Sequence, residues 1–230
     1  MHLLICFALK EEAAPFRKMA AGTVAAAQAA SILITGIGRR NAEKSVRKFL
    51  ATNLPELVLT CGFAGGLNPD LKPGDVVFEL TDRRGEFHEP QTENKIGDSQ
   101  SSPLREKLLA TGAKPAKFFC ADRIATTVAE KKKLRAETGA DAVELESGAI
   151  HVVGRERGIP CATVRVISDT AGEDLPLDFN QLAKPDMNLD YGKLAWAIAK
   201  SPGKISALLK LQKQTRFAAE RLANVLSKIQ

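Results

Sequence analysis

The sequence predicts an α/β fold with three layers, α/β/α, in which helices cover a central mixed and twisted sheet. Short apolar runs alternate with segments of helical periodicity along most of the chain. This alternation is typical of sheets covered by helices. Of the 230 residues, 44% are hydrophobic and 26% are charged, which is typical of a folded globular chain. We therefore expect one domain over residues 1–230, with a basic helical extension over about 190–230.

The elements follow in order along the chain. The first expected strand, His2 to Leu9, is followed by a helix from Glu11 to Met19. The second expected strand, Ser31 to Gly38, is followed by a helix from Asn41 to Thr52. Later strands are expected at Glu56 to Cys61, Asp75 to Leu80, Ala116 to Ala121, Ala142 to Leu145 and Pro160 to Ile167. Glycines end the two helices expected at Val128 to Gly139 and Ser147 to Gly158.

Two polar stretches interrupt this pattern. Thr81 to Ser102 has no apolar period and is expected to be a long loop, and such loops are often functional. Leu175 to Asn188 resembles a linker, and helices are expected after it at about Asp190 to Lys200 and Pro202 to Ile229.

The excess positive charge lies at the end of the chain. From Leu182 to Gln230 there are nine lysines and arginines against three acidic residues, whereas the earlier residues balance at 24 against 24. With only 5% aromatic residues, the chain lacks the pattern of a nucleic-acid binder. The tail has two interpretations: a helix packed on the domain with a solvated basic side, or a peripheral contact with anionic membrane.

The start of the chain, the cysteines and the histidines bear on where the protein lies in the cell and on whether it binds metal. The apolar start of the chain has no basic region before it and is too short for a signal peptide or a membrane span, so we expect a cytoplasmic protein. Its four scattered cysteines are expected to be buried thiols. We expect no metal, because the histidines are scattered and only Glu86 to Glu89 resembles a ligand cluster.

Polar residues follow several predicted strands, where ligands bind in open α/β sheets. They are Glu11 and Glu12; Gly36 to Arg40; Gly62 to Gly66; Glu144 with Glu146; and Ser168 with Asp169. Each set also has a structural interpretation: acidic residues in a first helical turn, tight turns, or a helix cap. The alternation around Leu145 predicts that Glu144 and Glu146 share one face, where burial without a partner would be costly.

Together these segments resemble the nucleoside phosphorylase/nucleosidase superfamily over about residues 2–172. The similar segments are Ala8 to Glu12, Thr35 to Gly38, Gly62 to Leu67 with Leu71 to Asp75, Val143 to Glu146 and Arg165 to Asp169. The pattern is most similar to the branch that cleaves methylthioadenosine and S-adenosylhomocysteine. From Asp186 to Asp190 and through the last basic helix, the tail resembles hopanoid-biosynthesis-associated members.

The resemblance implies a nucleoside phosphorylase-like fold and a nucleosidase that acts on a purine nucleoside, with adenine as the expected base. Asp169 would protonate or hydrogen-bond the purine N7, and Glu12 would activate the attacking water. Glu146, beside Glu144, would bind the ribose hydroxyls. The remaining implied substrate contacts are Phe63, Ala64, Gly65, Leu145 and Ser168. No cofactor is implied, and a homodimer is expected.

Departures from the family pattern affect specificity and mechanism. Phe63 stands where the nucleosidase branch usually has serine, and Ile124 stands about where that branch has a base-stacking phenylalanine. In the phosphorylase branch inorganic phosphate replaces water, and here Gly38, Arg39 and Arg165 are the candidates to bind it. The alternatives to hydrolysis are therefore a phosphate-dependent purine nucleoside phosphorylase and a non-catalytic nucleoside-binding module.

Overall fold

A mixed sheet forms the centre of the computed structural model, which describes residues 2–20, 30–81, 103–182, 184, 190–200 and 202–229. The sheet order within these residues is β2 (Ala30–Ile34), β1 (Leu3–Phe7), β3 (Leu57–Gly66), β8 (Cys161–Asp169), β4 (Val76–Thr81) and β5 (Lys114–Pro115). Strands β2, β1, β3 and β8 are parallel, and β4 runs antiparallel to β8. At its far end β3 also pairs with β7 (Ala142–Glu144), which pairs in turn with β6 (Phe118–Cys120). The expected mixed sheet is confirmed.

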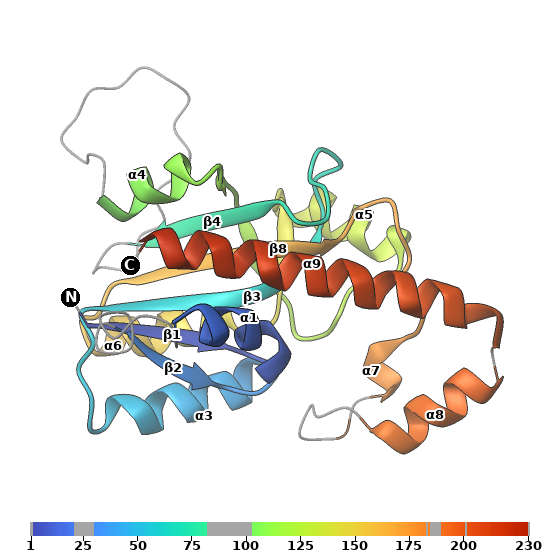
Figure 1. The fold of residues 1–230 in the computed structure, drawn as a ribbon, viewed down its shortest axis with the longest axis horizontal. Helices are drawn as coiled ribbons and strands as arrows, with labels where there is room; N and C mark the ends of the chain where they lie inside the picture. Colours follow the sequence, from blue (N-terminus) through green and yellow to red (C-terminus); the bar gives the residue numbers. More distant parts are fainter. Residues whose placement is uncertain are drawn as a thin grey trace.

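Helices cover both faces of this sheet (Figure 1). One face packs against α1 (Lys10–Ala20) and α9 (Ile205–Ile229), and the other packs against α3 (Arg39–Leu50) and α6 (Ser147–Glu156). The side chains of β1 alternate between two apolar clusters, one on each face of the sheet. Leu3, Ile5 and Phe7 face the first pair of helices, whereas Leu4 and Cys6 face the second. The three layers predicted from the sequence are therefore present.

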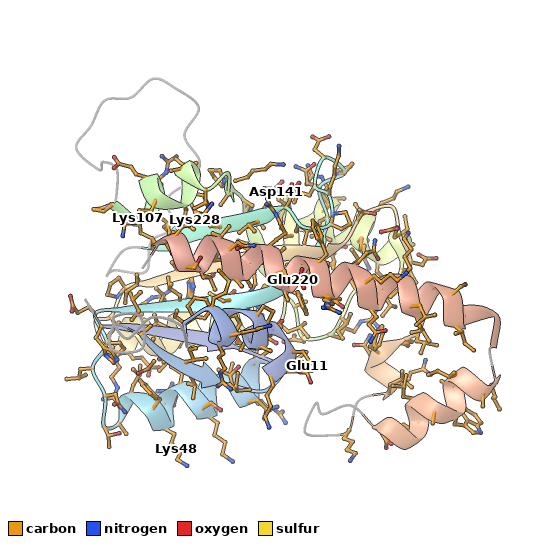
Figure 2. All side chains as sticks on the ribbon, in the orientation of Figure 1. Glu11, Lys48, Lys107, Asp141, Glu220 and Lys228 are labelled. Carbon is orange, nitrogen blue, oxygen red and sulfur yellow. The ribbon has the colours of Figure 1, made fainter. Side chains whose placement is uncertain are left out.

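The two halves of α9 have different surroundings. Its second half, from Ala218 onward, packs on the sheet, whereas the first half is mostly exposed. Figure 1 shows that first half beyond the end of the sheet, together with α7 (Phe179–Leu182), α8 (Tyr191–Lys200) and the short helix η1 (Pro202–Lys204). At the opposite end, Lys107 of α4 (Pro103–Ala110) donates to the carbonyl oxygen of Ile229 at 3.1 Å, and Figure 2 shows Lys107 near Lys228.

Some elements differ from the sequence prediction. Strand β3 continues through Gly66, so Gly62 to Gly66 belong to a strand and not to a loop. The expected linker contains α7, and α4 is an additional helix. Cys6, Cys61 and Cys161 are buried thiols as expected, whereas the thiol of Cys120 is partly exposed. The predicted loop after Thr81 and the cluster from Glu86 to Glu89 lie outside the described residues.

No helix among the described residues is long and apolar enough to cross a membrane.

Candidate functional site

A buried cation organises the carboxyl end of the sheet. Arg165, in the middle of β8, is only 1% exposed although it carries a guanidinium group. Its Nη2 atom lies 2.5 Å from Oε2 of Glu144 and 3.2 Å from Oε2 of Glu146. The same nitrogen donates to the hydroxyl of Thr60 at 3.0 Å. A buried charge is tolerated only with such partners, and here the partners are two carboxylates that would otherwise repel each other.

The two glutamates reach Arg165 from a strand end and a helix start. Glu144 ends β7, and Glu146 is the N-cap residue of α6. Glu144 accepts hydrogen bonds from the backbone N–H and the hydroxyl of Ser147, at 2.8 and 2.5 Å. Glu146 accepts one from the backbone N–H of Gly38 at 2.9 Å. The expected convergence of the two carboxylates is therefore present, although the chain has already left the strand at Glu146.

The surroundings shift the pKa values of Glu144 and Glu146 in opposite directions. Burial raises the pKa of Glu146, and the neighbouring charge of Glu144 raises it further against the effect of Arg165, so that this pKa lies above its ordinary value. Burial also acts on Glu144, but Arg165, Ser147 and the backbone N–H groups outweigh it and leave the pKa of Glu144 below its ordinary value. Glu144 is therefore the ionised partner of Arg165, and Glu146 is the group of the pair that exchanges a proton more easily.

A third carboxylate, Glu12, lies on the other side of Arg165. It is 4% exposed in the first turn of α1 and accepts from the backbone N–H groups of Leu9 and Phe63, each at 2.9 Å. Burial raises the pKa of Glu12, against the lowering effects of Arg165 and of these backbone donors. Its neighbour Glu11 is exposed and points outward at the end of α1 (Figure 2). The helix therefore separates two adjacent glutamates into one at the site and one in water.

Gly62 leaves room for Glu12 and Arg165 to lie close to the backbone of β3. Its φ is +145°, and a Cβ atom there would lie 2.6 Å from Oε1 of Glu12 and 2.8 Å from Nη1 of Arg165. No side chain fits between these two groups, so glycine is required for the close contact.

Asp169, the last residue of β8, is 7% exposed and has two side-chain partners. The hydroxyl of Ser168 lies 2.6 Å from its Oδ1 atom, and Nζ of Lys131 lies 2.5 Å from its Oδ2 atom. Lys131 belongs to α5 (Val128–Thr138) and has no exposed surface. The sequence does not single out Lys131, because Lys131 to Lys133 resemble a solvated charge run. Its spacing from Val128 and Leu134 was the available signal, since residues three apart share one helix face.

Strand β3 connects the two candidate catalytic carboxylates. The N–H of Phe63 binds Glu12, and a Cβ atom on Gly65 would lie 3.4 Å from Oδ2 of Asp169. Between them, the carbonyl oxygen of Ala64 lies 3.3 Å from the hydroxyl of Ser168. Glu12 and Asp169 thus flank the same short length of backbone.

The predicted contact Leu145 and the departing residue Ile124 lie in one apolar cluster beside this strand. Leu145 is buried there among Leu67 and Val143, and Ile124 packs against the same cluster. The side chain of Asn180, from α7, accepts a hydrogen bond from the backbone N–H of Ile124 and donates one to its carbonyl oxygen, each at 2.9 Å.

Each of the three candidate phosphate ligands already has a protein partner. Arg165 contacts Glu144 and Glu146, and the N–H of Gly38 binds Glu146. Arg39 lies at the surface, 3.2 Å from Asp122, and also donates to the carbonyl oxygen of Cys120. The three groups therefore do not form an open cationic cluster in this structure. Among the described residues, no group of three or more histidine, cysteine or acidic side chains could hold a metal ion.

Known proteins resemble this chain in sequence. Residues 7–189 match the family model described as the phosphorylase superfamily. Over 168 residues, 63% of this chain and 69% of its relative, the sequence is 26% identical to an aminodeoxyfutalosine nucleosidase of Campylobacter jejuni. It is 27% identical to a 5′-methylthioadenosine/S-adenosylhomocysteine nucleosidase of a Marinomonas species, over 66% of this chain and 73% of that protein.

Solved structures share the fold. A futalosine hydrolase of Helicobacter pylori superposes with a TM-score of 0.67 and 18% identity, covering 100% of this chain and 97% of that one. A 5′-methylthioadenosine/S-adenosylhomocysteine nucleosidase of Colwellia psychrerythraea, solved in complex with adenine, gives a TM-score of 0.68 at 18% identity, covering 100% and 94%.

Proposed function

Because the chain belongs to the phosphorylase superfamily, we propose that it hydrolyses the N-glycosidic bond of a purine nucleoside whose base is adenine. Its relatives make it an enzyme that cleaves N-glycosidic bonds. The observation that carries the hydrolytic assignment is the placement of Glu12 and Asp169 beside the same short stretch of β3, with Arg165 and its two glutamates nearby. This arrangement has the two carboxyl groups that glycoside hydrolysis needs.

In the proposed reaction the bond between the ribose C1′ and the purine N9 breaks, and its electron pair passes to the base. Positive charge develops on the sugar, while Asp169 supplies a proton to N7 of the leaving base. Water bonds to C1′ and gives its proton to Glu12. Burial raises the pKa of Glu12, which makes this carboxylate a stronger base toward water.

The ribose hydroxyls are assigned to Glu146, whose raised pKa suits a carboxyl group that exchanges hydrogen bonds with them. Phe63, Ala64, Gly65, Leu145 and Ser168 are assigned to the walls around the base and the sugar. Phe63 and Ile124 replace a serine and an aromatic residue of the resembling branch, so we expect a substrate specificity different from that branch.

Hydrolysis is favoured over phosphorolysis by the partners of the basic groups. Inorganic phosphate needs donors that are free to bind it, and arginine binds it through a planar fork. The Nη2 atom of Arg165 already contacts two carboxylates, and Arg39 pairs with Asp122 at the surface. Using either arginine for phosphate would require these ion pairs to open.

The test measures adenine release from adenosine, 5′-methylthioadenosine and a 5′-alkyl adenosine, each with and without inorganic phosphate. Hydrolysis predicts a free ribose-type sugar at the same rate in both conditions. Glu12→Gln and Asp169→Asn are each expected to lower kcat by about 10²–10⁴-fold, the usual contribution of general acid–base catalysis. Glu11→Gln is the matched control, because Glu11 is the exposed neighbour of Glu12 and should leave the rate unchanged.

Other outcomes would contradict the proposal in distinct ways. A requirement for phosphate, with ribose 1-phosphate as product, would identify a phosphorylase. Nucleoside binding without turnover on any of the three substrates would favour a non-catalytic binding module.

A bulky or lipid-like 5′ substituent, such as that of adenosylhopane, is part of the proposal, together with peripheral contact to an anionic membrane. The supporting observation is the unit formed by α8, η1 and the first half of α9. It carries the exposed apolar side chains Trp196, Ile205 and Leu209, at 62%, 44% and 53% exposure. Lysines surround them, including Lys200 above the Trp196 ring at 3.7 Å. Apolar side chains among cations suit the boundary of an anionic bilayer.

This unit lies near the proposed site. Lys210 of α9 pairs at 2.5 Å with Glu173, which follows the carboxyl end of β8. Sedimentation with anionic phosphatidylglycerol vesicles at low salt is the test, with phosphatidylcholine vesicles as the comparison. Trp196→Ala should weaken binding, whereas Leu54→Ala, which removes another exposed apolar side chain, should not. No binding of the unmodified protein to anionic vesicles would remove the membrane contact.

We also propose that the chain forms a homodimer, which light scattering after size-exclusion chromatography tests directly.

A further inference from the structure

Lys131 is a buried cation that has no role in the reaction proposed above. It lies on the inward face of α5 with a side-chain exposure of 0%, and its Nζ atom lies 2.5 Å from Oδ2 of Asp169. The same nitrogen donates to the carbonyl oxygens of Thr170 and Glu173, at 2.7 and 2.8 Å. An ammonium group has three N–H donors, and here all three have acceptors.

These contacts make Lys131 and Asp169 a buried ion pair. The three acceptors match the three N–H donors of an ammonium group, and the 2.5 Å contact joins that group to the carboxylate of Asp169. The other charged groups nearby are paired with each other or cap a helix. Glu173 pairs with Lys210 of α9, and the carboxylate of Asp174 accepts from the backbone N–H of Val128. Lys131 is thus the cation in direct contact with Asp169 among the described residues.

An ionised Asp169 raises a question about the proposed reaction, because a carboxylate has no proton to give to the leaving base. We propose that Lys131 is the positioning residue that keeps Asp169 ionised in the free enzyme and replaces the proton that Asp169 passes to the purine. This inference rests on the proposed function of the same site.

The proton balance follows from the contacts. As the bond between C1′ and N9 breaks, the base gains the electron pair, and N7 takes a proton from Asp169. That proton comes from the Lys131 ammonium through Oδ2, so Asp169 remains a carboxylate and Lys131 becomes a neutral amine. The water proton goes to Glu12. After the base leaves, solvent returns a proton to Lys131 through Asp169 and the emptied site, and Glu12 releases its proton.

The test compares Lys131→Met with the unmodified enzyme over pH 5 to 9. Methionine matches the length of the apolar stem but carries no charge. In this variant Asp169 must take its proton from solvent, so we expect kcat to lie about 10²-fold below that of the unmodified enzyme at pH 8, and this ratio to shrink as the pH is lowered, with KM within a few-fold. Lys133→Met is the matched control, because Lys133 lies on the same helix at 74% exposure and should leave the profile unchanged. A decrease of equal size at every pH together with a raised KM would overturn the proposal and indicate a structural role.

A second measurement does not depend on turnover. Infrared difference spectroscopy at pH 7 should detect one protonated carboxyl group in Lys131→Met beyond those of the unmodified protein, and this additional band should be absent from the Lys131→Met/Asp169→Asn double variant. Absence of this band in Lys131→Met would overturn the proposal, even where the protein hydrolyses none of the nucleosides. If the unmodified protein shows no turnover but the band appears as expected, the hydrolase assignment fails and the charge relationship stands.

Discussion

Replacing Arg165 with methionine tests whether its guanidinium group makes the buried carboxylate cluster stable. The group contacts Glu144 and Glu146 directly, and both pairs are almost completely buried. Removing one partner of a buried ion pair lowers the free energy of unfolding by about 3–5 kcal/mol. Because two carboxylates lose their partner here, we expect a loss near the upper end, about 5 kcal/mol at pH 8.

The pH dependence provides an internal check on this cause. Without Arg165, burial and mutual repulsion raise the folded-state pKa of both glutamates above the unfolded value of about 4.3. A raised carboxyl pKa destabilises the folded state at high pH, and the penalty disappears as the pH falls toward the unfolded value. The difference between the variant and the unmodified protein should therefore be large at pH 8 and clearly smaller at pH 5.5.

Urea unfolding followed by circular dichroism measures both differences. Adding Glu146→Gln to Arg165→Met should restore part of the loss at pH 8, because one uncompensated charge is removed. Arg47→Met is the control: Arg47 also contacts two glutamates, Glu43 and Glu156, but at 40% exposure, so water replaces the lost partner. A loss below about 1 kcal/mol in Arg165→Met at pH 8 would refute the reasoning, because it lies below the range for a broken buried pair. Equal losses at the two pH values would refute it as well.

Three further results are expected. Gly62→Ala should lower the melting temperature more than Gly112→Ala, because both have positive φ but only the Cβ atom at Gly62 would collide with Glu12 and Arg165; equal effects would mean that strain alone matters. The rate should fall at acidic pH as Glu12 becomes protonated, and because burial raises its pKa, this limb of kcat/KM should lie above the ordinary glutamate range and disappear in Glu12→Gln. Thr127→Ala removes the side chain that caps α5, so urea unfolding should show a loss of about 1 kcal/mol, whereas Thr52→Ala at an exposed turn should show less.

Local patterns in the sequence were enough to predict most of the sheet. Short apolar runs predicted β1, β2, β4 and β8, and the side chains of β1, β2 and β8 are buried against helices on both sides of the sheet. The extension of β3 through Gly66 was missed, since three glycines in five residues indicate a loop by local preference. Pairing with β8 on one side and β7 on the other overrides that preference.

The sequence was enough to predict the acidic residues of the candidate site, but not the basic residues that pair with them. Glu12, Glu144, Glu146 and Asp169 stand next to predicted strand ends, so their positions are local information. The partner of Asp169 is Lys131, which is 38 residues away in the chain. Arg165 was singled out, but as a candidate for phosphate and not as the partner of two glutamates. Pairing across such separations is decided by tertiary packing, which one sequence does not encode in any short pattern.

The second half of α9 has a consequence for the order in which the fold can be completed. Its buried side chains cover apolar residues of β1, β3, β4 and β8, which lie far earlier in the chain. During synthesis, all of these strands leave the ribosome before the helix that covers them. Until residue 218 and those after it have emerged, only α1 and α4 among the helices of this cluster can shield that face of the nascent sheet from water. The growing chain therefore depends on chaperones, or on fast completion of its synthesis, to avoid association through that face.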